Sequence, residues 1–162
     1  MKSRIAHRLA SFSGMASVLW LGILFADAHA ATYPVDDSAS QVLTPNLKMQ
    51  WESVAPSQGI GNRVIGQLVV LVRLQLAPWR DRNARVFMTL PARAEGAITA
   101  TWTTRGFLQS GSLRSGERAL IYAGRIAADR LEDTLALTLT ADGTRLERAE
   151  RLEFRFSIEV DE

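Results

Sequence analysis

The sequence predicts an antiparallel β-sandwich, and two observations lead to that fold class. Apolar and polar residues alternate in several short segments, which is the periodicity of strands with one buried face. Glycine and proline separate these segments at short intervals, and no long helical pattern lies between them. Many short strands joined by turns, without intervening helices, are typical of a sandwich of antiparallel sheets.

The first thirty residues have the pattern of a secretory signal peptide. A basic opening (Lys2, Arg4 and Arg8) precedes an apolar run over Ala16–Ala26 and then the small-residue exit Ala28-His29-Ala30. An uncleaved membrane anchor is the alternative, but a spanning helix needs about 20 apolar residues and this core is shorter. We therefore expect residues 1–30 to be a signal peptide cleaved after Ala30, and the rest of the chain to be exported through the periplasm.

Removal of this segment leaves an almost neutral chain. The sequence holds 19 Lys and Arg against 17 Asp and Glu, and the part after Ala30 carries 16 of each sign. It therefore lacks the basic footprint of a nucleic-acid-binding protein. There is no cysteine, so the exported domain must be stabilised by its core or by partners, not by disulfides.

Residues 31–46 are polar, contain Pro34 and Pro45, and predict a flexible N-terminal lead. The domain itself is expected over residues 47–162. Its first strand begins where Leu47, Met49 and Trp51 alternate with polar residues. A loop over residues 55–63 follows, and then a long apolar strand over Val64–Leu76 that we expect to be covered on both faces.

The remaining segments continue the strand pattern. Strands are predicted over Val86–Leu90, over the ITATWTT segment at residues 98–104, near Phe107-Leu108, over Ala119–Ala123, over Leu135–Leu139 and over Leu152–Val160. A single helical turn is expected around Ala127–Glu132. The result is one domain with seven or eight strands and no internal repeat.

The chain lacks the residues of the usual catalytic and metal sites. Its two histidines, His7 and His29, both lie in the signal region, so the exported part has neither an imidazole nor a thiol. That excludes nucleophile–base pairs built on histidine or cysteine and metal sites built on nitrogen and sulfur ligands. Glu132 and Asp133 could contribute to a carboxylate pair of the glycosidase type, but we favour the simpler interpretation that they are charges at a strand start. We predict no catalytic residue, no metal site, no cofactor and no enzyme activity.

The exported part contains three tryptophans, and their sequence neighbours predict how each one packs. Trp51 and Trp102 alternate with polar neighbours on their strands, which predicts core positions. Trp79 lies in a turn beside Arg80 and Arg82, where it would stack on an arginine or face a partner.

The order of these landmarks resembles one family. Asn46, the alternating strand with Leu47, Met49 and Trp51, and then Pro56 are similar to the start of the major subunits of colonisation-factor-antigen fimbriae, the alpha class of chaperone–usher pilins. Leu90-Pro91, the ITATWTTRG segment and the terminal alternating strand follow in a similar order. The lead before Asn46, the many arginines and the bulk of Trp51 depart from the family pattern.

The resemblance implies an immunoglobulin-like sandwich that lacks its final strand. A periplasmic chaperone would fill the gap first. At the outer-membrane usher, the N-terminal strand of the next subunit would replace it, so that like subunits join head to tail in a surface fimbria used for attachment. Leu47, Met49 and Trp51 would be the inserting side chains of that donor strand.

Two alternatives stay open beside this interpretation. The segment from Leu47 could be the first strand of a self-complete periplasmic or secreted sandwich, which would bind a ligand or a protein partner. A small hydrolase that uses only carboxylates is the third possibility, and it would require a cleft with two acids of raised pKa.

Overall fold

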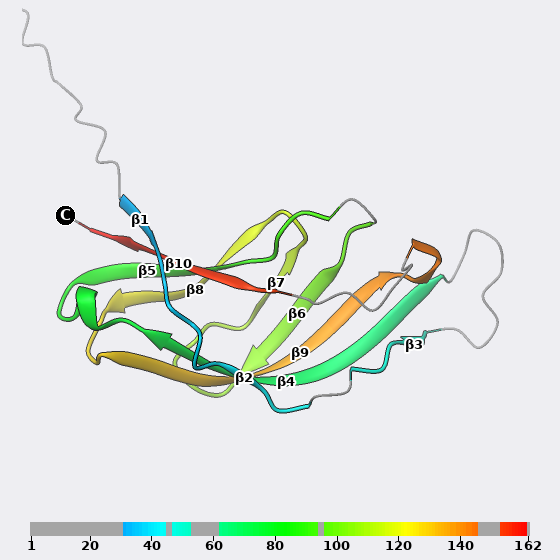
Figure 1. Ribbon diagram of the computed structural model, residues 1–162, viewed down its shortest axis with the longest axis horizontal. Helices are drawn as coiled ribbons and strands as arrows, with labels where there is room; N and C mark the ends of the chain where they lie inside the picture. Colours follow the sequence, from blue (N-terminus) through cyan, green and yellow to red (C-terminus); the bar gives the residue numbers. More distant parts are fainter. Residues whose placement is uncertain (1–30, 45–46, 53–61, 94–95, 146–152, 162) are drawn as a thin grey trace, which may run out of the picture.

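Two antiparallel sheets pack face to face in the computed structural model, as Figure 1 shows. The structure describes residues 31–44, 47–52, 62–93, 96–145 and 153–161. The predicted signal peptide, Asn46 and nearly all of the predicted loop at residues 55–63 lie outside these ranges. The alternation of apolar and polar residues thus produces the all-β sandwich that the sequence predicts, of immunoglobulin-like type.

The first sheet has four strands in the order β1-β10-β5-β8. They are β1 (Ala31–Pro34), β10 (Arg155–Val160), β5 (Asn83–Thr89) and β8 (Arg118–Arg125). The second sheet has six strands: the order β2-β4-β9-β6-β7, with β3 also paired to β4. They are β2 (Gln41–Val42), β3 (Gln50–Trp51), β4 (Arg63–Gln75), β9 (Arg130–Asp142), β6 (Thr99–Thr104) and β7 (Gly111–Arg114).

The core lies between the sheets and is made by alternate residues of each strand. The even-numbered positions of β4 other than Val70 are buried, as is Leu74, and the odd-numbered positions of β9 are buried, as is Leu135. Trp102 is 1% exposed, and its indole Nε1 donates to the Gln109 carbonyl at 2.8 Å, so its predicted core position is confirmed. The outer face of β4 is only partly covered, in contrast to the prediction of cover on both faces.

Two short segments differ from the sequence prediction. Residues 127–132 contain no helical turn, because β9 begins at Arg130 and pairs along β4 from its first residue. Phe107 and Leu108 lie in a loop instead of a strand, and β7 starts only at Gly111. Short 3-10 turns follow β4 (Ala77–Trp79) and β9 (Gly143–Arg145).

The N-terminal lead, expected to be flexible, is paired to both sheets. β1 runs antiparallel to β10, with Ala31 opposite Val160 and Pro34 opposite Ser157. The Val35 amide then donates to the Phe156 carbonyl at 3.0 Å, and the Gln75 amide donates to the Asp36 carbonyl at 2.9 Å. The lead therefore passes from one sheet to the other at Val35 and Asp36, as the blue segment of Figure 1 shows. The polar composition of the lead does not predict this pairing. The edges of β10 and β4 offer backbone hydrogen bonds, which a segment of any composition can make.

Candidate functional site

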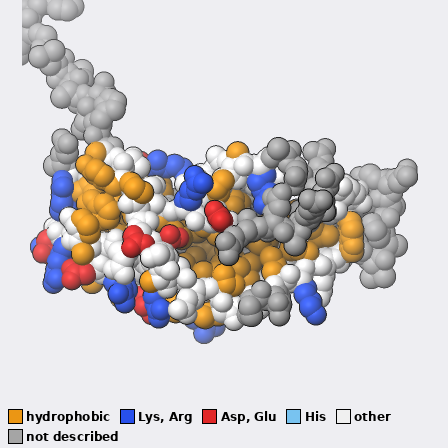
Figure 2. Space-filling model, in the orientation of Figure 1, with side chains coloured by type: hydrophobic (Ala, Val, Ile, Leu, Met, Phe, Trp, Pro, Cys, Tyr) orange, Lys and Arg blue, Asp and Glu red, His pale blue; other side chains and the backbone are white. Residues whose placement is uncertain are grey.

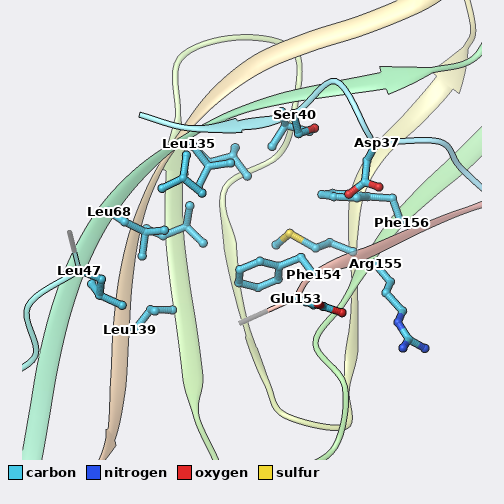
Figure 3. A pocket seen from close by; sticks show the side chains of 15 residues that line it. Asp37, Ser40, Leu47, Leu68, Leu135, Leu139, Glu153, Phe154, Arg155 and Phe156 are labelled. Carbon is cyan, nitrogen blue, oxygen red and sulfur yellow. The ribbon is translucent and has the colours of Figure 1, made fainter. Parts of the chain in front are cut away.

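An apolar groove lies between the sheets on the side of β4 and β10. Its volume is about 550 Å³. One wall is the inner face of β4 and β9, and the other comes from β5 and β10, as Figure 3 shows. The lining side chains are mostly apolar: Val42, Leu47, Leu68, Val70, Val72, Met88, Leu135, Leu137, Leu139, Phe154 and Phe156. In the described part of the chain, this groove is the interior of the sandwich reaching the surface, and Figure 2 shows hydrophobic side chains in the hollow.

The groove is open because the strands at its rim are short. On one side β1 pairs with β10 only as far as Ser157, and the Val35 amide donates to the Phe156 carbonyl, so the outer edge ahead of Phe156 has no ladder partner among the described residues. On the other side β2 covers β4 only at Val70 and Leu71. By contrast, the opposite side of the sandwich is joined by contacts between β7 and β8 and by the Gln109 amide, which donates to the Ile121 carbonyl at 2.7 Å.

Polar groups stand at the ends of the groove. Ser40 accepts at its Oγ from the Arg73 amide at 2.8 Å, which ties the lead to β4. Burial raises the pKa of the Asp37 carboxyl above its ordinary value, and the charge of Asp36 adds to the rise. Glu153 and Arg155 flank the two phenylalanines at the other rim.

The three side chains predicted to donate lie along β4 of their own chain. Leu47 and Met49 occupy the space that a Cβ on Gly66 would need, so this glycine allows them to lie against the inner face of β4. Trp51 pairs with Val64 in the ladder and packs against Gly143. The structure brings all three to one face, as their spacing predicts, and it places Leu47 in the groove wall.

Two of these side chains are held loosely, whereas Met49 packs partly buried against the core. Leu47 remains 38% exposed, and Trp51 is 48% exposed, so its predicted core position is wrong; β3 is only two residues long. Most of the large exposed hydrophobic side chains in the described residues belong to the lead and its continuation: Tyr33, Val42, Leu43, Leu47 and Trp51, against only Phe107 and Leu120 elsewhere. Exposed apolar side chains concentrated in one segment are typical of a surface that a partner covers.

The two adjacent carboxylates are not brought together. Glu132 points outward and pairs with Arg73 at 2.8 Å. Asp133 points inward, is 8% exposed and accepts hydrogen bonds from Thr104, Leu108 and Thr134. Consecutive residues of a strand face opposite sides, so this pair does not have the shared cleft that a carboxylate hydrolase needs.

Trp79 packs against an aromatic ring instead of an arginine. Its ring centroid lies 6.0 Å from that of Tyr33, with a tilt of 41° between the rings. Since Tyr33 belongs to β1, this contact adds a side-chain attachment between the lead and the turn after β4.

Sequence reasoning missed the β10 side of the groove. Phe154 and Phe156 line it, but their spacing in the sequence predicts only the alternation of a strand. The signal lay in two bulky aromatics on one face of a strand whose neighbour, β1, is too short to cover both.

No helix in the described residues is long and apolar enough to cross a membrane. Comparisons with family models, curated proteins and solved structures find no match to this chain.

Proposed function

We propose that the protein is a structural subunit of a surface fimbria, exported through the periplasm and assembled by donor-strand exchange. The observation that carries the proposal is the open groove between β4 and β10, which is lined by inner-face side chains of both sheets. An exposed apolar edge is an aggregation hazard in a protein that acts alone. It is useful in a protein whose partner supplies the missing strand.

The groove offers both parts of a strand-addition site. The outer edge of the last strand ahead of Phe156, whose carbonyl accepts from the Val35 amide, has no ladder partner in the described chain. Val70, Leu137 and Phe156 provide apolar contacts along the floor. Each apolar side chain that an incoming strand buries fully would contribute roughly 1.5–3 kcal/mol, so three would contribute roughly 5–9 kcal/mol before ordering costs.

The donor in this proposal is the segment that carries Leu47, Met49 and Trp51. In the single chain Leu47 and Trp51 stay partly exposed beside β4, so moving them out costs less than opening a closed core. Insertion into a second copy would bury them more completely. Such contacts are head to tail and do not close into a ring, and they therefore generate a fibre. A periplasmic chaperone would cover the groove before the outer-membrane usher delivers the next subunit, and the assembled fimbria would serve attachment.

Two complementary variants test this proposal. Val70→Arg places a charge in the groove, and Leu47→Asp combined with Trp51→Asp breaks the donor face. Each variant alone is expected to stay monomeric, while their mixture forms a one-to-one dimer, because one chain supplies an intact donor and the other an intact groove. Native mass spectrometry and light scattering measure the species. Lys48→Asp, on the other face of the same strand, is the matched control and should not prevent association.

A second candidate function rests on a different observation. β1, β2 and β3 all pair within their own chain, which is what a self-complete exported sandwich that binds a ligand or protein partner would show. If the two variants and the wild-type chain all remain monomers on mixing, and a chaperone–usher pair expressed with the chain leaves it monomeric, this second function is favoured and fimbrial assembly is refuted.

A further inference from the structure

A second pocket lies outside the groove and shares no lining residue with it. Its volume is about 320 Å³, at the lower end of the range of small-molecule sites. The floor is formed by Leu76, Ile126 and Leu131, which are 1%, 2% and 9% exposed. Phe107 and Tyr122 contribute aromatic rings to the lining, and Arg130 and Glu132 contribute charged groups.

The loop that carries Phe107 is fixed on both sides of it. The Thr104 hydroxyl and the Leu108 amide donate to Asp133 Oδ2 at 2.6 and 2.9 Å. The Gly106 amide donates to the Thr104 hydroxyl at 3.1 Å. Phe107 nevertheless remains 80% exposed. The buried Asp133 carboxylate thus fixes the loop on which Phe107 stays exposed to solvent, beside a pocket whose floor is apolar.

The Tyr122 side chain of the same pocket is also held in place. The Tyr122 hydroxyl donates to the Arg125 carbonyl at 2.7 Å. An aromatic ligand could therefore contact the rings of Phe107 and Tyr122 above an aliphatic floor. Offset or edge-to-face contacts between rings are favourable beyond the apolar area that they bury.

The charges around the pocket favour an anion. Glu132 is paired with Arg73 at 2.8 Å, and Asp129 is paired with Arg80 at 3.0 Å. Arg130 forms no ion pair with a described carboxylate. When the side-chain amide of Gln75 is oriented with its oxygen toward Arg130, that oxygen accepts from Arg130 Nε and Nη2 at 3.2 and 3.3 Å. That contact orients the guanidinium and leaves its other N–H groups for a ligand.

The geometry points to a binding site for a small aromatic carboxylate. The ring would lie between Phe107 and Tyr122, and the carboxylate would accept hydrogen bonds from Arg130 in the two-point manner that guanidinium groups favour. This site is independent of fimbrial assembly, since the groove and its donor segment take no part in it.

Methyl NMR with three probes tests the proposal. Benzoate carries the ring and the charge, benzyl alcohol the ring without charge, and acetate the charge without a ring. Benzoate is expected to shift the methyl signals of Leu76, Ile126 and Leu131 saturably, while those of Leu68 and Leu139 in the groove stay in place. Benzyl alcohol should bind about tenfold more weakly, and acetate should not shift these methyls.

Two exposed side chains supply the variants. Phe107→Ala and Arg130→Gln should each weaken benzoate binding about tenfold, and Arg130→Gln should leave benzyl alcohol binding unchanged. Arg114→Gln, an exposed arginine on β7, is the matched control. The proposal is overturned if benzoate shifts no floor methyl, if it shifts the groove methyls instead, or if Arg114→Gln weakens binding as much as Arg130→Gln.

Discussion

Replacement of Asp133 by asparagine tests how the buried carboxylate holds its loop. Asp133 Oδ2 accepts from the Thr104 hydroxyl at 2.6 Å and from the Leu108 amide at 2.9 Å, and Oδ1 accepts from the Thr134 amide at 2.7 Å. Every partner donates, so all of them need an acceptor. Asparagine keeps one oxygen and replaces the other by an NH₂ group, which can only donate.

The structure decides which orientation the new amide takes and what it costs. With nitrogen at the Oδ2 position, the buried Leu108 amide faces a donor. With nitrogen at the Oδ1 position, only the Thr134 amide loses its acceptor, and this is the cheaper arrangement. One lost hydrogen bond with an unsatisfied donor, offset in part because a buried charge is removed, gives about 2 kcal/mol of destabilisation. Asp133→Ala leaves all three donors unsatisfied and should cost about 4 kcal/mol.

Urea unfolding followed by tryptophan fluorescence measures this series, since Trp102 donates to the Gln109 carbonyl in the same loop. The midpoint should fall from wild type to Asp133→Asn to Asp133→Ala with an unchanged slope. The matched control is Glu132→Gln, which removes an exposed ion pair and should cost about 1 kcal/mol or less. If Asp133→Asn is as stable as wild type while Glu132→Gln is not, the account of the buried carboxylate is refuted.

Three further predictions concern the lead and the strand that follows it. Val35→Ala removes two buried carbons at about 0.8 kcal/mol each and should cost about 1–2 kcal/mol; hydrogen exchange should show weaker protection of the Val35 amide, and unchanged protection would contradict the seating of the lead. Because the pKa of Asp37 is raised in the folded chain, its ionisation opposes folding: the unfolding free energy of wild type relative to Asp37→Asn should fall as the pH rises from below 3.8, the ordinary value, through the raised pKa. Parallel urea curves against pH for the two chains would argue against this. Trp51→Ala should cost only about 1–2 kcal/mol because the side chain is 48% exposed, and a loss as large as a core tryptophan's, about 3–5 kcal/mol, would mean that it is fully packed.

The sequence predicts the strands whose side chains alternate and bury one face. β5, β6, β8 and β10 lie within a few residues of their expected ranges, and β9 is longer than its Leu135–Leu139 centre. Alternation is a local property of consecutive residues, so it can be read without knowledge of the partner strand. The common face of Leu47, Met49 and Trp51 was predictable for the same reason.

The groove and the paired lead could not be read in this way. The edges of β4 and β10 become neighbours only after the chain has folded, and no local pattern records that. β1 and β2 form because those edges offer backbone donors and acceptors, which do not depend on side-chain type. The role of Asp133 was hidden for a similar reason, since its donors Thr104 and Leu108 lie 29 and 25 residues away.

The pairing of β1 with β10 has a mechanical consequence. Ala31 lies opposite Val160 and Pro34 opposite Ser157, so the first described residues and the end of β10 sit at the same end of the first sheet, as Figure 1 shows. A force that pulls Ala31 away from Val160 would break the ladder one pair at a time, like a zipper, instead of loading all its hydrogen bonds together in shear. The attachment of the lead therefore yields at low force until the pull reaches Val35 and Asp36, where the core and the second sheet begin to resist.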